Sequence, residues 1–393
     1  MEEVSPRTRS VRIGGTVASM ERAFQPHLGI YKSHEQGEFR GRRGEIQIPA
    51  ELVGIVTGVF GLDERRVARR KAVHTATAAT VSSKMIPLSP PVLQDHYNFP
   101  PGTGEGQQIA IAEFEGGYFQ EDLAAFCKKY SLPVPKVTSV PAGLTPLTLA
   151  EIQKLSPQQR DDELSASIEV NMDVQIVAGL CPRSEIFVYF APFTQKGWVD
   201  LLHKIMTGAP AKPVALSISW GLAEDCPDWS AAALTAINER LEAVALLGIT
   251  VCVSSGDDGS GDELTDGRAH VEFPSSSPFV LSVGGTMING SAANSSEQAW
   301  WESPGQRTNQ GGGSSGGGVS TVFPRPKWQN VQVKSLNKGS IDASVLPDVA
   351  ALAGPPLYDL IFLGPRFPQW WHQRLDATLG GARGADQWEH RCV

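Results

Sequence analysis

Residues 214–220, VALSISW, and residues 249–254, ITVCVS, decide the fold class of this chain. Both are short, mostly apolar runs of strand length, and the stretch from Ser230 to Leu247 between them is helical in pattern. Apolar strands that alternate with helices are typical of a parallel sheet covered on both faces. The sequence therefore predicts an α/β fold.

The same alternation continues toward the N-terminus. Residues 108–114 and 184–190 are predicted strands, and Glu121 to Tyr130 is a predicted helix. These elements extend the predicted parallel sheet with helices on both faces. Functional groups in such sheets gather at the carboxyl ends of the strands, so the site is expected there.

The chain divides into two parts before and after a predicted linker. Residues 1–71 form a first block, in which residues 46–56 predict a short strand and then a helix that begins with a proline. Residues 72–92 are rich in small residues and proline and predict a linker. Residues 93–364 form the main domain, in which the Gly/Ser run 311–318 has the composition of a flexible loop.

Charge and composition exclude several classes of function. The net charge of −8 argues against nucleic acid as the main partner, and no apolar run is long enough to span a membrane. The polar first ten residues show no secretory signal, which leaves export open. The five cysteines lack CxxC spacing, so we expect mostly buried thiols and no metal site.

Three acidic residues are candidates for chemistry. Ser156–Pro157 predicts a helix start, and Glu169 and Asp173 are neighbours four residues apart on that helix. Two close carboxylates repel when both are ionised, so one tends to keep a proton, which suits acid–base chemistry. A solvated acidic face explains the same spacing. Asp257 lies in a Gly-rich loop after a predicted strand, and such a loop alone is usually a turn.

Taken together and in order, these pieces resemble the sedolisin family of serine-carboxyl peptidases. The resemblance runs from about residue 12 to residue 364. Its motifs are YNFP (97–100), Glu169 with DVQIVAGLCP (173–182), FVYFAP (187–192), SISWG (217–221), SGD (255–257), FPSSSP (273–278), VGGT (283–286), GGGVS (316–320) and FP (323–324). The first block, through FRG (39–41) and VFGLD (59–63), resembles the end of the family's activation propeptide, closest to the kumamolisin type.

This resemblance implies a subtilisin-like parallel sheet preceded by a small α+β activation prodomain. It implies that Glu169 takes the nucleophile's proton, that Asp173 orients Glu169, and that a protonated Asp257 donates to the oxyanion, which requires acid pH or a raised pKa. The implied partners are a peptide or protein substrate and the chain's own propeptide. Calcium is the implied cofactor, and an extracellular location is implied too. The implied substrate-binding residues are Ser217, Ser219, Trp220 and Gly221.

The resemblance stops at residue 364. The family's nucleophile motif, Gly-Gly-Thr-Ser-Ala-x-x-Pro, is absent, residues 365–393 contain no serine, and the family's calcium loop is missing too. Trp370 to Gln373 must be encoded TGG-TGG-CAY-CAR. Read one base further on, these codons give Gly-Gly, then a codon that allows Thr and one that allows Ser. We therefore expect an out-of-frame tail over 365–393 and no nucleophile in the chain as written.

Two other functions remain as alternatives. The chain could be a pseudopeptidase remnant that acts only as a peptide- or partner-binding module. A two-carboxylate glycosidase built on Glu169 and Asp173 is disfavoured, because a pair on one helix face does not flank a substrate.

Overall fold

A computed structural model describes residues 2–33, 36–67, 69–70, 88–264, 266–289, 296–307, 312–337, 342–355 and 358–362. Its centre is an eight-stranded sheet of order β14-β13-β11-β9-β6-β8-β7, in which β19 also pairs with β13. Every pairing in this sheet is parallel except that of β13 with β14. The strands are β6 (Gln108–Glu113), β7 (Val137–Pro141), β8 (Glu185–Phe190), β9 (Ala215–Ile218), β11 (Thr250–Ser254), β13 (Leu281–Asn289), β14 (Ser296–Ala299) and β19 (Val349–Leu352).

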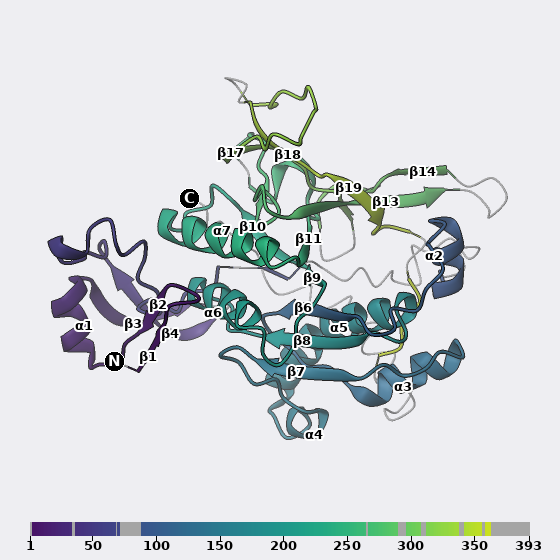
Figure 1. Ribbon diagram of the computed structural model, residues 1–393, viewed down its shortest axis with the longest axis horizontal. Helices are drawn as coiled ribbons and strands as arrows, with labels where there is room; N and C mark the ends of the chain where they lie inside the picture. Colours follow the sequence, from purple (N-terminus) through teal and green to yellow (C-terminus); the bar gives the residue numbers. More distant parts are fainter. Residues whose placement is uncertain are drawn as a thin grey trace.

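Helices cover the sheet on both faces, as the sequence predicts (Figure 1). Successive strand residues point to opposite faces. In β6, Ala110 and Ala112 join the core beneath α6 (Gln195–Met206) and α7 (Ala231–Leu246), whereas Ile111 joins the core beneath α3 (Gln120–Lys129) and α5 (Pro157–Leu180). The sheet therefore packs between two layers of helices, and the α/β fold class is confirmed.

The strongest helix predictions are confirmed with small shifts at their ends. Ser156 caps α5, its side chain accepting from the Gln159 backbone, and Pro157 occupies the first turn. The predicted strand 214–220 is divided at Ser219 into β9 and β10 (Trp220–Ala223). A short α4 (Leu149–Ile152) precedes α5.

Smaller pairings surround the main sheet. β10 is the middle strand of a separate three-stranded sheet, between β12 (Glu272–Phe273) and β5 (Arg69–Arg70). The remaining elements of the main domain are α2 (Pro90–His96), η2 (Gly259–Gly261), β15 (Trp301–Glu302) with β16 (Gly313–Ser314), and β17 (Gly318–Pro324) with β18 (Ala343–Leu346).

The N-terminal block lies at one end of the molecule beside α6 (Figure 1). Its elements are β1 (Glu3–Ser5), β2 (Ser10–Arg12), α1 (Val17–Phe24), β3 (His27–Ser33), β4 (Gly37–Arg43) and η1 (Ala50–Leu52). Arg12 pairs with Asp200 of α6 at 3.2 Å, and Arg66 pairs with Glu115 at 2.8 Å. Val67 is buried in the core of the main domain, so the chain enters that domain directly after the block.

One local prediction is wrong, one is confirmed in part, and one stays largely untested. The strand expected at residues 46–48 does not form, and the helix after it is only the single turn η1. Cys127, Cys181 and Cys252 are free thiols as expected, but Cys226 is disulfide-bonded. Most of the predicted linker 72–92 lies outside the described residues, and α2 begins within it at Pro90.

The structure gives no sign of a membrane-spanning helix: within the parts of the chain that it describes, none is both long and apolar enough.

Candidate active site

The two carboxylates of α5 lie inside the protein. Glu169 is 1% exposed and Asp173, about one turn further along the helix, is 8% exposed. Burial raises the pKa of Asp173 to about 6, although a hydrogen bond from Ser219 lowers it. The solvated acidic face is therefore wrong as an explanation of this spacing, and Asp173 can hold a proton in mildly acidic solution.

Ser219 connects these carboxylates to the sheet. It lies between β9 and β10, at the carboxyl end of β9 where functional groups were expected. Its Oγ donates a hydrogen bond to Asp173 Oδ2 over 2.9 Å. The interruption of the strand at this residue thus coincides with a contact between the sheet and the candidate catalytic helix.

Glu113, which the sequence analysis missed, is a third buried carboxylate near this edge. It ends β6, is 0% exposed, and accepts a hydrogen bond from Trp220 Nε1 over 3.0 Å. Trp220 itself is fully buried against Phe114 and Phe193. An acidic residue at the carboxyl end of an otherwise apolar strand was the signal that could have identified Glu113.

The loop that carries Asp257 is held by the Gly/Ser run, which is not the flexible loop that its composition predicts. The Ser314 backbone N–H donates to the Asp257 carbonyl, and the Gly316 N–H donates to the Gly256 carbonyl, both over 2.8 Å. A Cβ atom at Gly316 would lie 2.2 Å from the Ser255 carbonyl oxygen. The glycine is therefore required by close backbone approach.

Arg307 is a largely buried cation beside Asp257, and sequence reasoning missed it too. Its backbone N–H and its Nε each donate to Asp258 over 2.7 Å, and its Nη1 lies 3.7 Å from Asp257 Oδ2. Burial lowers the pKa of Arg307, but the charges of Asp258 and Asp257 outweigh burial and raise it. No local pattern links Arg307 to a loop 49 residues earlier in the chain.

Asp257, Ser217 and Ser219 open into one cavity of about 320 Å³ at the carboxyl ends of the strands. Its walls come from β9, β11, β13 and β19, together with Trp300. Glu169 and Asp173 do not line the cavity themselves: Ser219, which does, donates to Asp173, and Glu169 lies about one turn before Asp173 on α5. Trp220 and Gly221 do not line the cavity.

Gly221 belongs instead to the paired edge of β10. Gly221 lies opposite Arg69, and Trp220 opposite Arg70, in an antiparallel pairing with β5. The backbone of the predicted substrate-binding strand is therefore already paired with the end of the N-terminal block.

Comparison with known proteins identifies the family. Residues 1–65 match the family model described as "Pro-kumamolisin, activation domain". Kumamolisin from Bacillus sp. (strain MN-32) is 34% identical over 364 residues, which cover 90% of this chain and 62% of that protein. This chain belongs to the sedolisin family. Sedolisin from Pseudomonas sp. (strain 101) is 25% identical over 368 residues, covering 88% of this chain and 58% of that protein.

The fold of this sedolisin-family chain is similar to that of a solved relative. Pseudomonas sedolisin, a serine-carboxyl proteinase complexed with two molecules of pseudo-iodotyrostatin, superposes with a TM-score of 0.54 at 22% identity. The similarity covers 69% of this chain and 72% of that one. Against kumamolisin and sedolisin as whole proteins, the chain spans less than two thirds of their length.

The predicted nucleophile segment and tail, residues 365–393, lie outside the described residues. The chain before them returns to α5, where the Ile361 N–H donates to Gln175 Oε1 over 2.8 Å. The described residues contain no group of three or more His, Cys, Asp or Glu side chains that could hold a metal ion. They therefore do not fit the family's calcium, and we derive no step through it.

Proposed function

We propose that this chain is the proform of a serine-carboxyl endopeptidase that hydrolyses peptide bonds at acidic pH, and that the 393 residues as written lack its nucleophile. The observation that carries the proposal is the path from buried Asp173 through Ser219 to the cavity that Asp257 also lines. This path links Asp173, with Glu169 about one turn before it on α5, and Asp257 to one partly open cavity at the edge of the sheet.

The proposed roles follow from this arrangement. Glu169, deep in α5, accepts the proton of the attacking hydroxyl as general base. Asp173 orients Glu169, and its raised pKa keeps a proton within the pair in mildly acidic solution. Asp257 faces the cavity and, when protonated, donates a hydrogen bond to the oxyanion of the tetrahedral intermediate.

The proposal includes the N-terminal block as an inhibitory prodomain. β5 occupies the edge of β10 with backbone hydrogen bonds, which is how an extended peptide adds to a strand. The block is also tied to the main domain by Arg66 and by buried Val67. A peptide substrate and the covalently linked propeptide would then compete for the same strand edge.

A frameshift before Trp370 accounts for the missing serine. The segment that precedes the nucleophile motif in the family corresponds to residues 346–350. β19 begins within it and contributes Ala351 and Leu352 to the cavity, which Ala353, the next residue, also lines. A nucleophile supplied by the shifted frame would therefore follow a chain segment that already lines the proposed site. Resequencing the gene around codons 355–371 tests this part directly.

The activity test compares the chain as written with a frame-restored version in which Gly-Gly-Thr-Ser replaces residues 370–373. We expect no serine-dependent peptidase activity from the chain as written at about pH 3–5, because the serine of the family's nucleophile motif is absent. The hydroxyls that line the cavity, those of Ser217, Ser219 and Ser254, stand on or beside strands where the family places no nucleophile. Restoring the frame should recover activity, and Glu169→Ala should abolish it again.

The matched control is Asp161→Ala, which removes an acidic residue about two turns earlier on α5 and should leave activity in place. Robust acid proteolysis by the unmodified chain, lost on Glu169→Ala, would show that another residue is the nucleophile.

The absent motif also supports a second candidate, a pseudopeptidase that binds peptides without cleaving them. An intact cavity with no nucleophile is the observation in its favour. A gene sequence that confirms the present reading frame, together with measurable peptide binding at about pH 4, would support it over the enzyme.

A further inference from the structure

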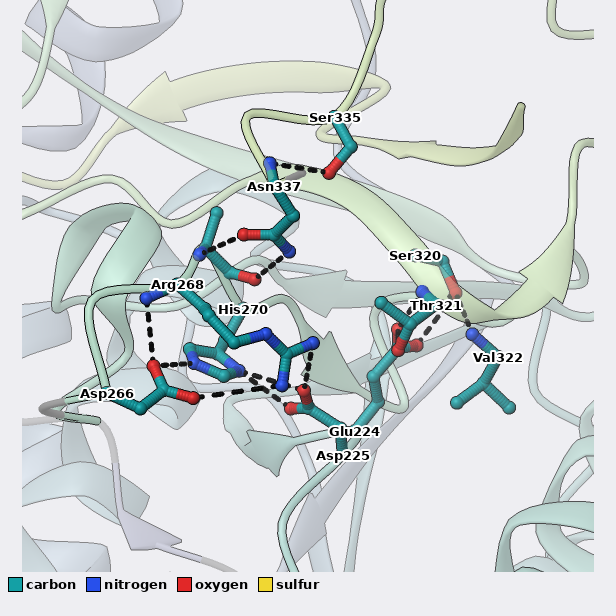
Figure 2. Close-up of polar contacts among 11 residues, drawn as sticks. Glu224, Asp225, Asp266, Arg268, His270, Ser320, Thr321, Val322, Ser335 and Asn337 are labelled. Carbon is teal, nitrogen blue, oxygen red and sulfur yellow. Dashed lines mark hydrogen bonds and ion pairs between the residues drawn. The ribbon is translucent and has the colours of Figure 1, made fainter. Parts of the chain in front are cut away.

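His270 lies outside the cavity, in a polar cluster with Asp225, Asp266 and Arg268 (Figure 2). Its side chain is 1% exposed. Nδ1 lies 2.8 Å from Asp225 Oδ1 and 3.0 Å from Oδ2, and Nε2 lies 2.9 Å from Asp266 Oδ1. A neutral imidazole donates from one nitrogen only, whereas the imidazolium donates from both. Two carboxylates at hydrogen-bond distance therefore fit a protonated ring.

The charges around the ring balance only when it is protonated. Arg268 lies 3.6 Å from Asp225 and 3.7 Å from Asp266, so the cluster holds two carboxylates and one permanent cation besides His270. Glu224, the residue before Asp225, points away from the ring toward β17, where it accepts from Ser320 Oγ over 2.8 Å (Figure 2). A protonated His270 makes the cluster neutral, and a neutral His270 leaves it with one net negative charge around a buried ring.

The cluster connects two parts of the site that the sequence analysis singled out, the end of β10 and the loop that carries Asp257. β10 pairs with β12, and the Glu224 N–H extends this pairing by donating to the Val271 carbonyl over 2.9 Å. The Asp225–His270 contact comes next along the same ladder. The His270 backbone N–H then donates to the Ser260 carbonyl over 2.8 Å, three residues after Asp257. One side chain thus closes the connection between the end of β10 and the Asp257 loop.

We propose that His270 is a positioning residue of the candidate site, whose imidazolium clamps the Asp257 loop to the end of β10 and loosens it as the ring loses its proton. The inference rests on the proposed function only in giving Asp257 a catalytic role. It names no catalytic contact for His270 itself: the ring holds the residue against Asp225 and Asp266, and the backbone N–H of the same residue bonds the Ser260 carbonyl.

The direction of the pH effect follows from the contacts. Burial alone lowers the pKa of His270, but the hydrogen bonds and charges of Asp266 and Asp225 outweigh it and raise the pKa. The clamp is therefore complete below the unfolded value of about 6.5 and is lost as pH rises through the higher folded value. The pKa of Asp266 is lowered, first by its hydrogen bond with His270, so its contribution is lost only in acid, below about 3.9.

The test uses the full chain and two measurements. Nitrogen NMR of the histidine rings should show His270 protonated on both nitrogens at about pH 6.5, where an ordinary histidine is half titrated. Hydrogen exchange of the amides in residues 255–264, corrected for intrinsic rates, should show greater protection at about pH 5 than at about pH 8. His270→Gln keeps a polar side chain without the titratable charge and should remove the pH dependence of that protection.

Asn337→Ala is the matched control. The Asn337 side chain holds the segment that carries His270 by bonding both the N–H and the carbonyl of Ala269, at 2.7 and 2.8 Å, and it does not titrate. Its removal should lower protection by a similar factor at both pH values. A neutral His270 ring at about pH 6.5, or wild-type loop protection that is equal at both pH values, overturns the proposal. Neither readout requires catalysis, so an inactive frame-restored enzyme would count against the proposed function and leave this inference standing.

Discussion

Replacing Asp173 by asparagine tests whether the Asp173 carboxyl is buried and has a raised pKa in the folded chain. In the folded chain the pKa of Asp173 is raised by burial to about 6, against about 3.9 for an unfolded aspartate. The folded state therefore binds this proton more tightly than the unfolded state. Stability from Asp173 is complete below about pH 3.9 and is lost as pH rises through about 6.

The difference of about two pKa units corresponds to about 3 kcal/mol, at 1.36 kcal/mol per unit. Asparagine carries no charge and keeps an oxygen that can accept from Ser219 Oγ, so it avoids the cost of a buried carboxylate at neutral pH. The free energy of unfolding of Asp173→Asn, minus that of the wild type, should therefore be larger at about pH 8 than at about pH 4. We expect this increase to reach up to 3 kcal/mol. For a domain of this size that is a shift in melting temperature of roughly 5–10 °C.

The assay is thermal or urea unfolding of both proteins at several pH values, with the difference between them taken at each pH. Other titrating groups cancel in that difference as long as they do not contact Asp173. Ser219→Ala is the opposite perturbation, because it removes the hydrogen bond that favours the ionised form of Asp173. The pH at which Asp173 loses its proton, and with it the fall in stability, should be higher in this variant than in the wild type. A difference that stays constant from about pH 4 to pH 8 would refute the burial and the raised pKa together.

Two further predictions concern the Asp257 loop and the domain boundary. Arg307→Gln removes the guanidinium from Asp258, whose side chain is 0% exposed, and should destabilise the chain by about 3–5 kcal/mol in urea unfolding, whereas Arg268→Gln, at a more exposed cation, should cost less than about 1 kcal/mol. Equal losses of unfolding free energy in the two variants would show that burial of the Arg307–Asp258 pair does not increase the cost of breaking it. Limited proteolysis of the folded chain should cut first within residues 72–92, because the linker composition predicted there suits a protease; first cuts within residues 40–65 would place the boundary elsewhere.

The sequence was informative where local pattern and burial agree. The strands and helices of the sheet were predictable because apolar runs of strand length alternate with helical ones, and the Ser156 cap marked the start of α5. Glu169 and Asp173 were predictable as neighbours from their spacing alone. Their burial was not, because it depends on the sheet and helices that pack around α5.

The parts that could not be predicted depend on contacts between distant segments. The Gly/Ser run has the composition of a flexible loop, yet Gly316 is fixed by backbone bonding to a loop about sixty residues earlier. Arg307 and His270 have no local signature either, since their carboxylate partners lie on other segments or outside any regular helix. The failed strand at residues 46–48 shows the converse: apolar and polar residues alternate there, yet the segment takes part in none of the strand pairings among the described residues.

Asp173 and His270 together imply a single direction of pH dependence for the site. Both groups have a raised pKa in the folded chain, although one is an acid whose charge is disfavoured by burial and the other a base whose charge is favoured by two carboxylates. In each case the folded state holds the proton more tightly, so the contribution of Asp173 is lost as pH rises through about 6 and that of His270 at a pH above about 6.5. The two contributions to stability therefore fall in the same direction over neighbouring pH ranges. A double variant, Asp173→Asn with His270→Gln, should unfold with a much flatter dependence on pH between about 5 and 8 than either single variant, because the two sites are independent and their effects add.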